Sequence, residues 1–253
     1  MLTREAFLVG DMVDFLGRIK SATAPMRRSV AGILVPSQLS YSAQFEDRIA
    51  LTRIMMEGID RSAIRYLDIG AGDPVYLSNT YLFYRLGGCG VLVEPDARYA
   101  NRIQAKRPRD VLVAAGVAFD ERKSSEITLF TSPLFNTFSA DHARTTLEQS
   151  TKWLPNQRQK IVKKLEVPLL PANEILHRHF SDGAPHFISI DAEGVDFEVL
   201  KSIDFTAFGP RILCVERQAS IDAHLDVIGR DRYELIYQTR DNLMFARRGA
   251  AAS

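Results

Sequence analysis

The spacing of apolar residues divides the chain into two parts. In residues 4–20, apolar side chains recur every three or four positions, which predicts an amphipathic helix. A second helix is expected over Phe45–Met56, after a polar stretch. From Ile64 onward, short apolar runs alternate with helical segments, a pattern typical of a parallel sheet with crossover helices. We therefore interpret residues 1–60 as a helical extension or lid and residues 61–253 as one α/β domain.

The α/β part has a definite expected order of strands and helices. The strands are expected at Arg65–Ile69, Val91–Glu94, Val111–Val117, His186–Asp191 and Ile212–Glu216. The helices between them are expected at Leu77–Leu86, Ala97–Arg107, Ala172–Phe180 and Val195–Lys201. Tyr233–Gln238 and Asn242–Arg247 flank a polar turn, which predicts an antiparallel hairpin and hence a mixed sheet. Residues 131–165 do not fit the alternation and are interpreted as an inserted loop plus a polar helix.

The bulk composition is that of an ordinary globular domain. The 253 residues are 46% hydrophobic and 25% charged, and the 32 basic and 31 acidic residues nearly cancel. This balance does not indicate a nucleic-acid partner, which usually requires a basic surface. Two cysteines disfavour a disulfide-stapled secreted fold. No apolar run is long enough to span a bilayer, and residues 1–30 lack a signal-peptide core, so a cytoplasmic location is expected.

The apolar stripe in residues 4–20 leaves three alternatives open. It would pack on the main domain, on a second subunit or on a membrane surface. Such a stripe usually packs against other parts of the protein. A homodimer through this helix is kept as an alternative.

The most informative segment is a strand and turn, Tyr66-Leu67-Asp68-Ile69-Gly70-Ala71-Gly72-Asp73-Pro74. Ligands of open α/β sheets lie beyond the carboxyl ends of the strands, and glycines let the backbone approach them closely. A dinucleotide fingerprint would have a third glycine where Val75 stands and would present a helix N-terminus to a pyrophosphate. The carboxylates of Asp68 and Asp73 would repel phosphates, whereas they suit the ammonium and sulfonium charges of S-adenosylmethionine.

The next expected strand ends in Glu94. An acid at this place can accept both hydroxyls of a ribose, a use shared with dinucleotide folds. Glu94 therefore indicates a nucleoside ligand without choosing among nucleosides. A helix cap ahead of Ala97 is the alternative for Glu94, although Asp96 is better placed for that role.

With these two elements in place, the sequence resembles the FkbM family of methyltransferases from about Ser40 to Ala246. The similar segments are Ser40–Asp47, Asp68–Pro74, Ser78–Tyr84, Val93–Asp96, Ile188–Ser202 and Pro210–Glu216. Ile188–Ser202 is the most specific of them. In the first segment, Phe45 stands where the family has glycine. That segment is interpreted as a lid or a cofactor-side helix.

The resemblance implies a class I methyltransferase, Rossmann-like fold: a mostly parallel sheet with an antiparallel C-terminal hairpin and helices on both faces. It implies S-adenosylmethionine as the methyl donor. It also implies O-methylation, commonly of a sugar hydroxyl or of another hydroxylated small molecule. The expected cofactor-binding residues are Asp68, Gly70, Ala71, Gly72, Asp73, Asn79, Glu94, Pro95, Asp96 and Asp191.

Candidate catalytic acids follow the expected strands at His186–Asp191 and Ile212–Glu216. A sugar hydroxyl is a poor nucleophile while protonated, so a base or a metal must assist it. Asp191 is expected nearest the reacting centre, with Glu193 beside it. Oxygen ligands from Asp191, Glu193 and Glu216 would also suit Mg²⁺, so a metal role stays open. Asp196 is interpreted as an acid that caps the next helix.

His142 is the third catalytic candidate. It follows Phe135–Asp141, which resembles the acceptor-side loop of the family. The ordinary pKa of histidine suits a general base. A plain surface histidine is the favoured alternative.

Basic residues cluster in two segments. From Arg98 to Arg109 they recur at helical spacing, which is typical of a solvated helix face. Residues 150–166 carry a second cluster, which would bind an anionic sugar, a nucleotide-sugar or a lipid-linked phosphate, or form a solvated face; we favour the solvated face.

Two other functions stay open at this point. An NAD-dependent oxidoreductase is disfavoured by Asp73 and Val75. A non-catalytic Rossmann-like binding subunit is disfavoured by the acids Asp68, Glu94 and Asp191, which such a subunit would not need.

Overall fold

The structure, a computed structural model, describes residues 40–132, 135–153 and 158–249, and for residues 150–153 it describes the backbone alone. The helix expected in residues 4–20, and the homodimer through it, fall outside the described residues. None of the helices within the described ranges has both the length and the apolar character to cross a membrane.

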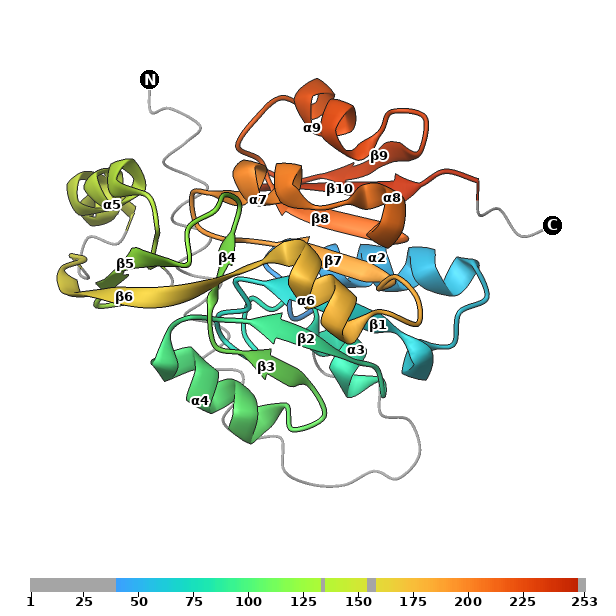
Figure 1. The fold of residues 1–253 in the computed structure, drawn as a ribbon, viewed down its shortest axis with the longest axis horizontal. Helices are drawn as coiled ribbons and strands as arrows, with labels where there is room; N and C mark the ends of the chain where they lie inside the picture. Colours follow the sequence, from blue (N-terminus) through green and yellow to red (C-terminus); the bar gives the residue numbers. More distant parts are fainter. Residues whose placement is uncertain (1–39, 133–134, 154–157, 250–253) are drawn as a thin grey trace, which may run out of the picture.

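A seven-stranded sheet forms the centre of the molecule, in the order β3-β2-β1-β7-β8-β10-β9 (Figure 1). Its strands are β1 Arg65–Ile69, β2 Cys89–Val93, β3 Val111–Val113, β7 Phe187–Ile190, β8 Ile212–Glu216, β9 Tyr233–Gln238 and β10 Asn242–Arg247. Neighbours from β3 to β8 are parallel, whereas β10 runs antiparallel to both β8 and β9. The expected mixed sheet and its C-terminal hairpin are confirmed.

Helices cover both faces of this sheet, because side chains alternate along each strand. Among the described residues outside 119–171, the helices are η1 Arg61–Ala63 (a short 3₁₀ turn), α2 Glu46–Met56, α3 Tyr81–Arg85, α4 Ala97–Lys106, α6 Ala172–His179, α7 Asp196–Ser202, α8 Phe205–Phe208 and α9 Ile221–Ile228. Leu67 and Ile69 of β1 pack in the core that α6, α7, α8 and α9 cover, and Tyr66 packs in the opposite core with α2, α3 and α4.

The helix expected over Leu77–Leu86 is shorter in the structure. It begins only at Tyr81, because Leu77 has a left-handed backbone with φ 59° and cannot continue a right-handed helix. The hydroxyl of Ser78 accepts the N–H of Tyr81 at 3.1 Å, which satisfies a donor at the new start.

The single strand expected over Val111–Val117 is wrong. The chain bends after β3, where the N–H of Ala115 donates to the carbonyl of Val113, and then enters β4, Gly116–Ala118. β4 belongs to a separate three-stranded sheet, β4-β6-β5, with β5 at Ser124–Phe130 and β6 at Ile161–Pro171. Figure 1 shows this sheet and α5, Ala140–Trp153, at one end of the molecule.

Residues 131–165, which were expected to form a loop plus a polar helix, therefore contain the first part of strand β6 as well as helix α5. Residues 161–166 of β6 are mostly exposed, so they lack the apolar alternation by which a half-buried strand is found. Their partners in β5 lie more than thirty residues earlier in the chain, between Ser124 and Phe130. Only the tertiary pairing identifies them as a strand.

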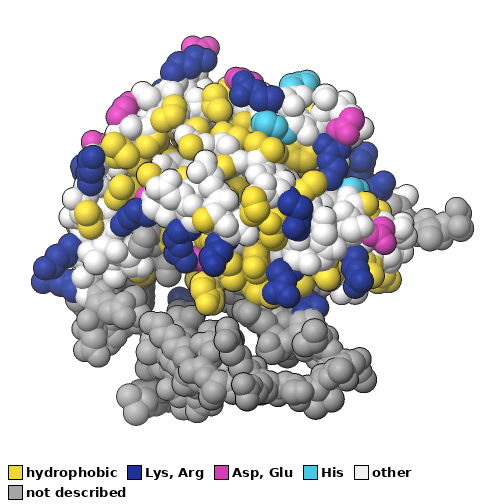
Figure 2. All heavy atoms as spheres, turned by 90° about the horizontal axis from the view of Figure 1, so that it is seen from below, with side chains coloured by type: hydrophobic (Ala, Val, Ile, Leu, Met, Phe, Trp, Pro, Cys, Tyr) yellow, Lys and Arg dark blue, Asp and Glu magenta, His cyan; other side chains and the backbone are white. Residues whose placement is uncertain are grey.

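The basic residues expected on a solvated face of α4 are exposed with one exception. Arg98, Arg102 and Lys106 are exposed. Figure 2 shows Lys and Arg side chains distributed over the face seen from below. Arg107 is fully buried, so a solvated position is wrong for this residue.

Arg107 is stabilised in the interior by a complete set of polar partners. Its Nε lies 2.7 Å from Oδ2 of Asp110, and its guanidinium donates to the hydroxyls of Tyr66 at 3.1 Å and Thr80 at 3.0 Å. The Thr80 hydroxyl in turn donates to Asp68 at 2.5 Å. These bonds join the end of α4 to β1 and to the segment before α3, directly beneath the turn that follows β1.

We expect Arg107→Leu to lower the free energy of unfolding by about 3–5 kcal/mol, because it leaves the Asp110 carboxylate buried without its charge partner. Lys106→Leu, at the neighbouring exposed position, should change that free energy by about 0.5 kcal/mol or less. Urea unfolding followed by circular dichroism measures both values. Equal losses in the two variants would contradict a structural role for the buried guanidinium.

Candidate functional site

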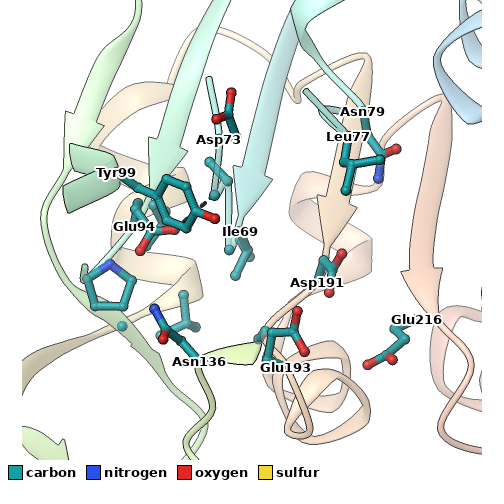
Figure 3. Close-up of a pocket in the computed structure, with 18 of the residues that line it drawn as sticks. Ile69, Asp73, Leu77, Asn79, Glu94, Tyr99, Asn136, Asp191, Glu193 and Glu216 are labelled. Carbon is teal, nitrogen blue, oxygen red and sulfur yellow. Dashed lines mark hydrogen bonds between the residues drawn. The ribbon is translucent and has the colours of Figure 1, made fainter. Parts of the chain in front are cut away.

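A cavity of about 350 Å³ opens at the carboxyl edge of the parallel strands, where ligands of such sheets bind. Figure 3 shows its side chains converging from the segments that follow β1, β2, β7 and β8. The predicted residues in its wall are Gly70, Ala71, Gly72, Asp73, Asn79, Glu94, Pro95, Asp191, Glu193 and Glu216. Asp68, Asp96 and His142 lie outside the wall.

The turn after β1 depends on two glycines at positive φ, Gly70 at 77° and Gly72 at 55°. The N–H groups of Gly70 and Ala71 donate to the Val93 carbonyl at 3.0 and 3.2 Å, which fastens the turn to the end of β2. A Cβ on Gly70 would lie 1.8 Å from the carbonyl oxygen of Asp191, whereas a Cβ on Gly72 would meet no atom closer than 3.9 Å. Residue 70 must therefore be glycine, because the segments that follow β1 and β7 are in contact at this point. The space beside Gly72 is open.

The two carboxylates of this turn have different partners. Asp68 is buried beneath the turn with the Thr80 hydroxyl, and its burial raises its pKa. Asp73 lies in the cavity wall, where Oδ1 accepts the N–H of Val75 at 2.9 Å and Oδ2 lies 2.7 Å from Arg102. Asp68 thus supports the turn from below, and the charge of Asp73 has a basic partner.

Glu94 points into the cavity from the end of β2 (Figure 3). Its Oε2 accepts the N–H of Gly72 at 2.9 Å, and its Oε1 accepts the N–H of Asp96 at 2.7 Å. Burial raises the pKa of Glu94 to about 7, although these two hydrogen bonds oppose the shift. Each carboxylate oxygen retains acceptor capacity, so Glu94 can bind two hydroxyl groups.

Asp96 caps α4 and also recruits the loop after β5. Its Oδ1 accepts the N–H of Arg98 at 2.8 Å, and its Oδ2 accepts the amide of Asn136 at 2.7 Å. Burial raises the pKa of Asp96, but the Arg98 guanidinium, 2.6 Å from Oδ2, together with these two hydrogen bonds outweighs burial and lowers the pKa below its ordinary value. Asn136 lies in the cavity wall, so Asp96 shapes the cavity from outside it.

Carboxylates gather at the other end of the cavity, where β7 and β8 end side by side. Asp191, Asp196 and Glu216 each place one oxygen within 4.8 Å of the others. The sequence analysis placed Glu193 in this group, where the structure has Asp196 instead; Glu193 points into the cavity beside them (Figure 3). Burial and the nearby Glu216 raise the pKa of Asp191 to about 7, and burial together with Asp191 raises the pKa of Glu193.

Asp196 organises the loop that carries these acids. It is the first residue of α7 and is fully buried, but the expectation that it caps this helix is wrong, because Val195 occupies the N-cap position and no side chain caps the helix there. Its carboxylate accepts the backbone N–H groups of Ala192 and Gly194 and the amide of Gln218. Between those two donors Glu193 has φ 51°, and non-glycine residues in this conformation concentrate at functional sites.

His142 lies behind this loop. Its Nδ1 is 3.1 Å from the position that a Cβ on Gly194 would occupy, and its backbone N–H donates to the Ser139 hydroxyl at 3.2 Å. In this arrangement the acids, and not His142, face the cavity.

The segment before α2 closes one side of the cavity. Ala43 lies in the wall. Asp47 accepts the N–H of Tyr41 at 2.8 Å, and Glu46 accepts the Asn242 amide at 2.9 Å. Glu46 therefore holds the segment against the C-terminal hairpin, whereas Asp47 holds the segment in its own turn. Both side chains are fully buried and are not exposed to a ligand.

Sequence reasoning missed several residues that complete the wall. They are Tyr76, Leu77, Tyr99, Asn136, Phe138, Asp241 and Asn242. Asn136 and Phe138 belong to the loop that resembles the acceptor side of the family, which was the available signal. Asp241 and Asn242 occupy an ordinary hairpin turn, and nothing in its pattern indicates that it faces the cavity.

Comparison with known proteins decides the family. A sequence profile described as a methyltransferase FkbM domain matches residues 68–234, which is more than half of the chain. The chain belongs to the FkbM methyltransferase family. Its sheet order and C-terminal hairpin are those of the class I methyltransferase fold, and the methyl donor is S-adenosylmethionine.

More distant similarities to solved structures accompany this FkbM match. A TehB-like SAM-dependent methyltransferase from Corynebacterium glutamicum is 10% identical, with a TM-score of 0.40 and coverage of 94% of this chain and 99% of that one. An O-methyltransferase from Bacillus cereus in complex with SAH is 13% identical, with a TM-score of 0.35 and coverage of 94% and 90%. No curated protein matches the chain. The family assignment rests on the profile match.

The residues around the FkbM cavity fit S-adenosylmethionine. Glu94 has acceptor capacity for two hydroxyls, and the open space at Gly72 lets a ligand approach the backbone. Asp191 and Glu193 offer negative charge for an ammonium or sulfonium group. The described wall contains no lysine or arginine, the side chains that would bind the pyrophosphate of a dinucleotide.

We expect Gly70→Ala to lower the free energy of unfolding by about 3 kcal/mol or more, since the new Cβ clashes with backbone and the φ is unfavourable for alanine. Gly72→Ala is the matched control: it has positive φ but open space, and should cost about 1–2 kcal/mol. Guanidinium unfolding measures both. If Gly72→Ala were the more damaging change, the proposed contact between the two strand ends would not be the reason for glycine at residue 70.

Proposed function

We propose that this methyltransferase transfers the methyl group to a hydroxyl oxygen of a sugar, a glycan or another hydroxylated small molecule. The observation that carries the proposal is that one cavity has two chemically different ends. Glu94, oriented by two backbone N–H groups, lies at one end, and the carboxylates of Asp191 and Glu193 lie at the other (Figure 3). The first end suits a nucleoside, and the second suits a hydroxyl that must lose a proton.

At the nucleoside end, Glu94 accepts the two ribose hydroxyls. The ring of Tyr99 stands beside Glu94 (Figure 3), and Pro95 lines the same wall. Both exclude water from these hydrogen bonds. Asn136 reaches the same end from the loop after β5, held there by Asp96. Exclusion of water strengthens polar contacts, because the local dielectric falls.

At the other end, bound S-adenosylmethionine supplies a methyl group on a positively charged sulfur. Asp191 receives the proton of the acceptor hydroxyl as the oxygen bonds to the methyl carbon and the carbon–sulfur bond breaks. A pKa of about 7 suits this role, because a general base works best when its pKa lies near the operating pH. Glu193 orients the hydroxyl from the adjacent position in the wall.

A divalent ion such as Mg²⁺ is the second candidate for this end, since Asp191, Asp196 and Glu216 bring carboxylate oxygens within 4.8 Å of one another. Asp196, however, already accepts two backbone N–H groups and the Gln218 amide. We therefore favour proton transfer to Asp191. Turnover that falls with a chelator and returns with Mg²⁺ would favour the ion instead.

Calorimetric titration tests the nucleoside end. S-adenosylhomocysteine should bind saturably and NAD should not. Glu94→Gln should weaken S-adenosylhomocysteine binding by about 10- to 100-fold, because hydrogen bonds to charged groups contribute about 1.5–3 kcal/mol. Glu198→Gln, a change at an exposed acid of α7, is the control and should leave that affinity unchanged. Binding of NAD alone would contradict the proposal.

Transfer of a labelled methyl group tests the catalytic end. Asp191→Asn should lower the rate by about 100-fold or more, because the amide cannot take the proton, while S-adenosylhomocysteine still binds. Since the active form of Asp191 is the carboxylate and its pKa is about 7, the wild-type rate should fall by about tenfold per pH unit below pH 7 and level off above it. A rate that is constant between about pH 5 and 8 would exclude Asp191 as the base.

A further inference from the structure

The cavity carries negative charge without a basic side chain in its described wall. Its acids are Asp73, Glu94, Asp191, Glu193, Glu216 and Asp241. Of the described residues that line it, none is Lys, Arg or His. Two of the acids have basic partners outside the wall: Asp73 pairs with Arg102 at 2.7 Å, and Asp241 lies 3.8 Å from Arg240.

The acids at the end of β7 and β8 have no such partner. Within the described part of the chain, no ion pair reaches Asp191, Glu193 or Glu216. Glu216 accepts the Gln218 amide at 3.2 Å, a neutral donor. Figure 3 shows the three carboxylates on the side of the cavity away from Glu94. This side is therefore short of positive charge.

S-adenosylmethionine carries less positive charge than these three acids carry negative charge when all of them are ionised. Its sulfonium and ammonium groups are offset by its own carboxylate, so it brings a single net positive charge. Carboxylates held close together in a partly buried site repel one another strongly. A second cation bound with the acceptor would relieve that repulsion.

We propose, building on the function proposed above, that the acceptor of this methyltransferase carries an ammonium group beside its hydroxyl, as an amino sugar or an aminocyclitol does. An ammonium group has three N–H donors and matches several carboxylate acceptors at once. Glu193 and Glu216 line the same cavity as Asp191, and carboxylate oxygens of Asp191 and Glu216 lie within 4.8 Å of each other, so an ammonium group bound by Glu193 and Glu216 lies beside the hydroxyl that Asp191 deprotonates. The same acids repel a sugar acid, a nucleotide-sugar or a lipid-linked phosphate.

The basic segment after α5 does not alter this charge balance. Arg158, Lys160, Lys163 and Lys164 are exposed, and none of them lies in the cavity wall. Lys164 pairs with Glu126 across the ribbon at 2.7 Å. The described part of this segment is a solvated surface, as favoured from the sequence, and it brings no anion-binding group to the cavity.

Calorimetry on the complex with S-adenosylhomocysteine tests the proposal. The matched probes are glucosamine, N-acetylglucosamine and glucuronic acid, together with 2-deoxystreptamine and its uncharged counterpart myo-inositol. Each amine should bind saturably and about tenfold or more tighter than its neutral partner, and glucuronic acid should not bind. Glu216→Gln should reduce the preference for the amine by about tenfold, whereas Glu198→Gln, an exposed acid outside the wall, should preserve it.

Failure of this proposal and failure of the proposed function give different results. Lack of S-adenosylhomocysteine binding by the wild-type protein would contradict the proposed function. Binding of S-adenosylhomocysteine with no preference for either amine, or with no binding of either, would overturn the cationic acceptor. A preference that survives Glu216→Gln unchanged would also overturn it, and so would Mg²⁺ binding that competes with the amines.

Discussion

The contact between Gly70 and the carbonyl of Asp191 is the constraint on which the site depends. β1 and β7 are parallel neighbours, and both chains turn away from the sheet at the same edge. A side chain on Gly70 would occupy the space of the Asp191 carbonyl, so the two turns meet only because this residue has no Cβ. That contact joins the turn after β1 to the acidic loop after β7, and both segments line the same cavity.

The charged side chains beneath the cavity have fixed partners, whereas Asp191 within the cavity has no ion-pair partner. Arg107, Asp110 and Asp68 form a network in which each charge has a fixed partner, and Asp196 is satisfied by backbone and amide donors. Such satisfied groups stabilise a single arrangement of the turns. Asp191 faces the cavity without an ion-pair partner, and burial together with the nearby carboxylate of Glu216 raises its pKa. A bound ligand must therefore supply the positive charge that the protein does not place beside Asp191.

The second sheet completes the site at long range. The ribbon of β5 and β6 carries the loop that presents Asn136, and Asp96 binds the amide of that residue at the start of α4. The C-terminal hairpin plays a similar part on the opposite side, where Asn242 holds Glu46 and lines the cavity. Segments from both ends of the chain therefore enclose a site whose centre is the parallel sheet.

The sequence by itself determined where β1, β2, β7, β8, β9 and β10 lie along the chain, the glycine turn and the acids that end β2, β7 and β8, because side-chain periodicity and turn chemistry depend on neighbouring residues. Only the tertiary structure showed that Asp68 and Asp96 act from outside the cavity, that Asp241 faces it, and that residues 161–166 form a strand. It also showed that Arg107 is buried. These positions depend on contacts with residues that are far apart in the sequence. A local sequence pattern does not show which distant residue a side chain will contact.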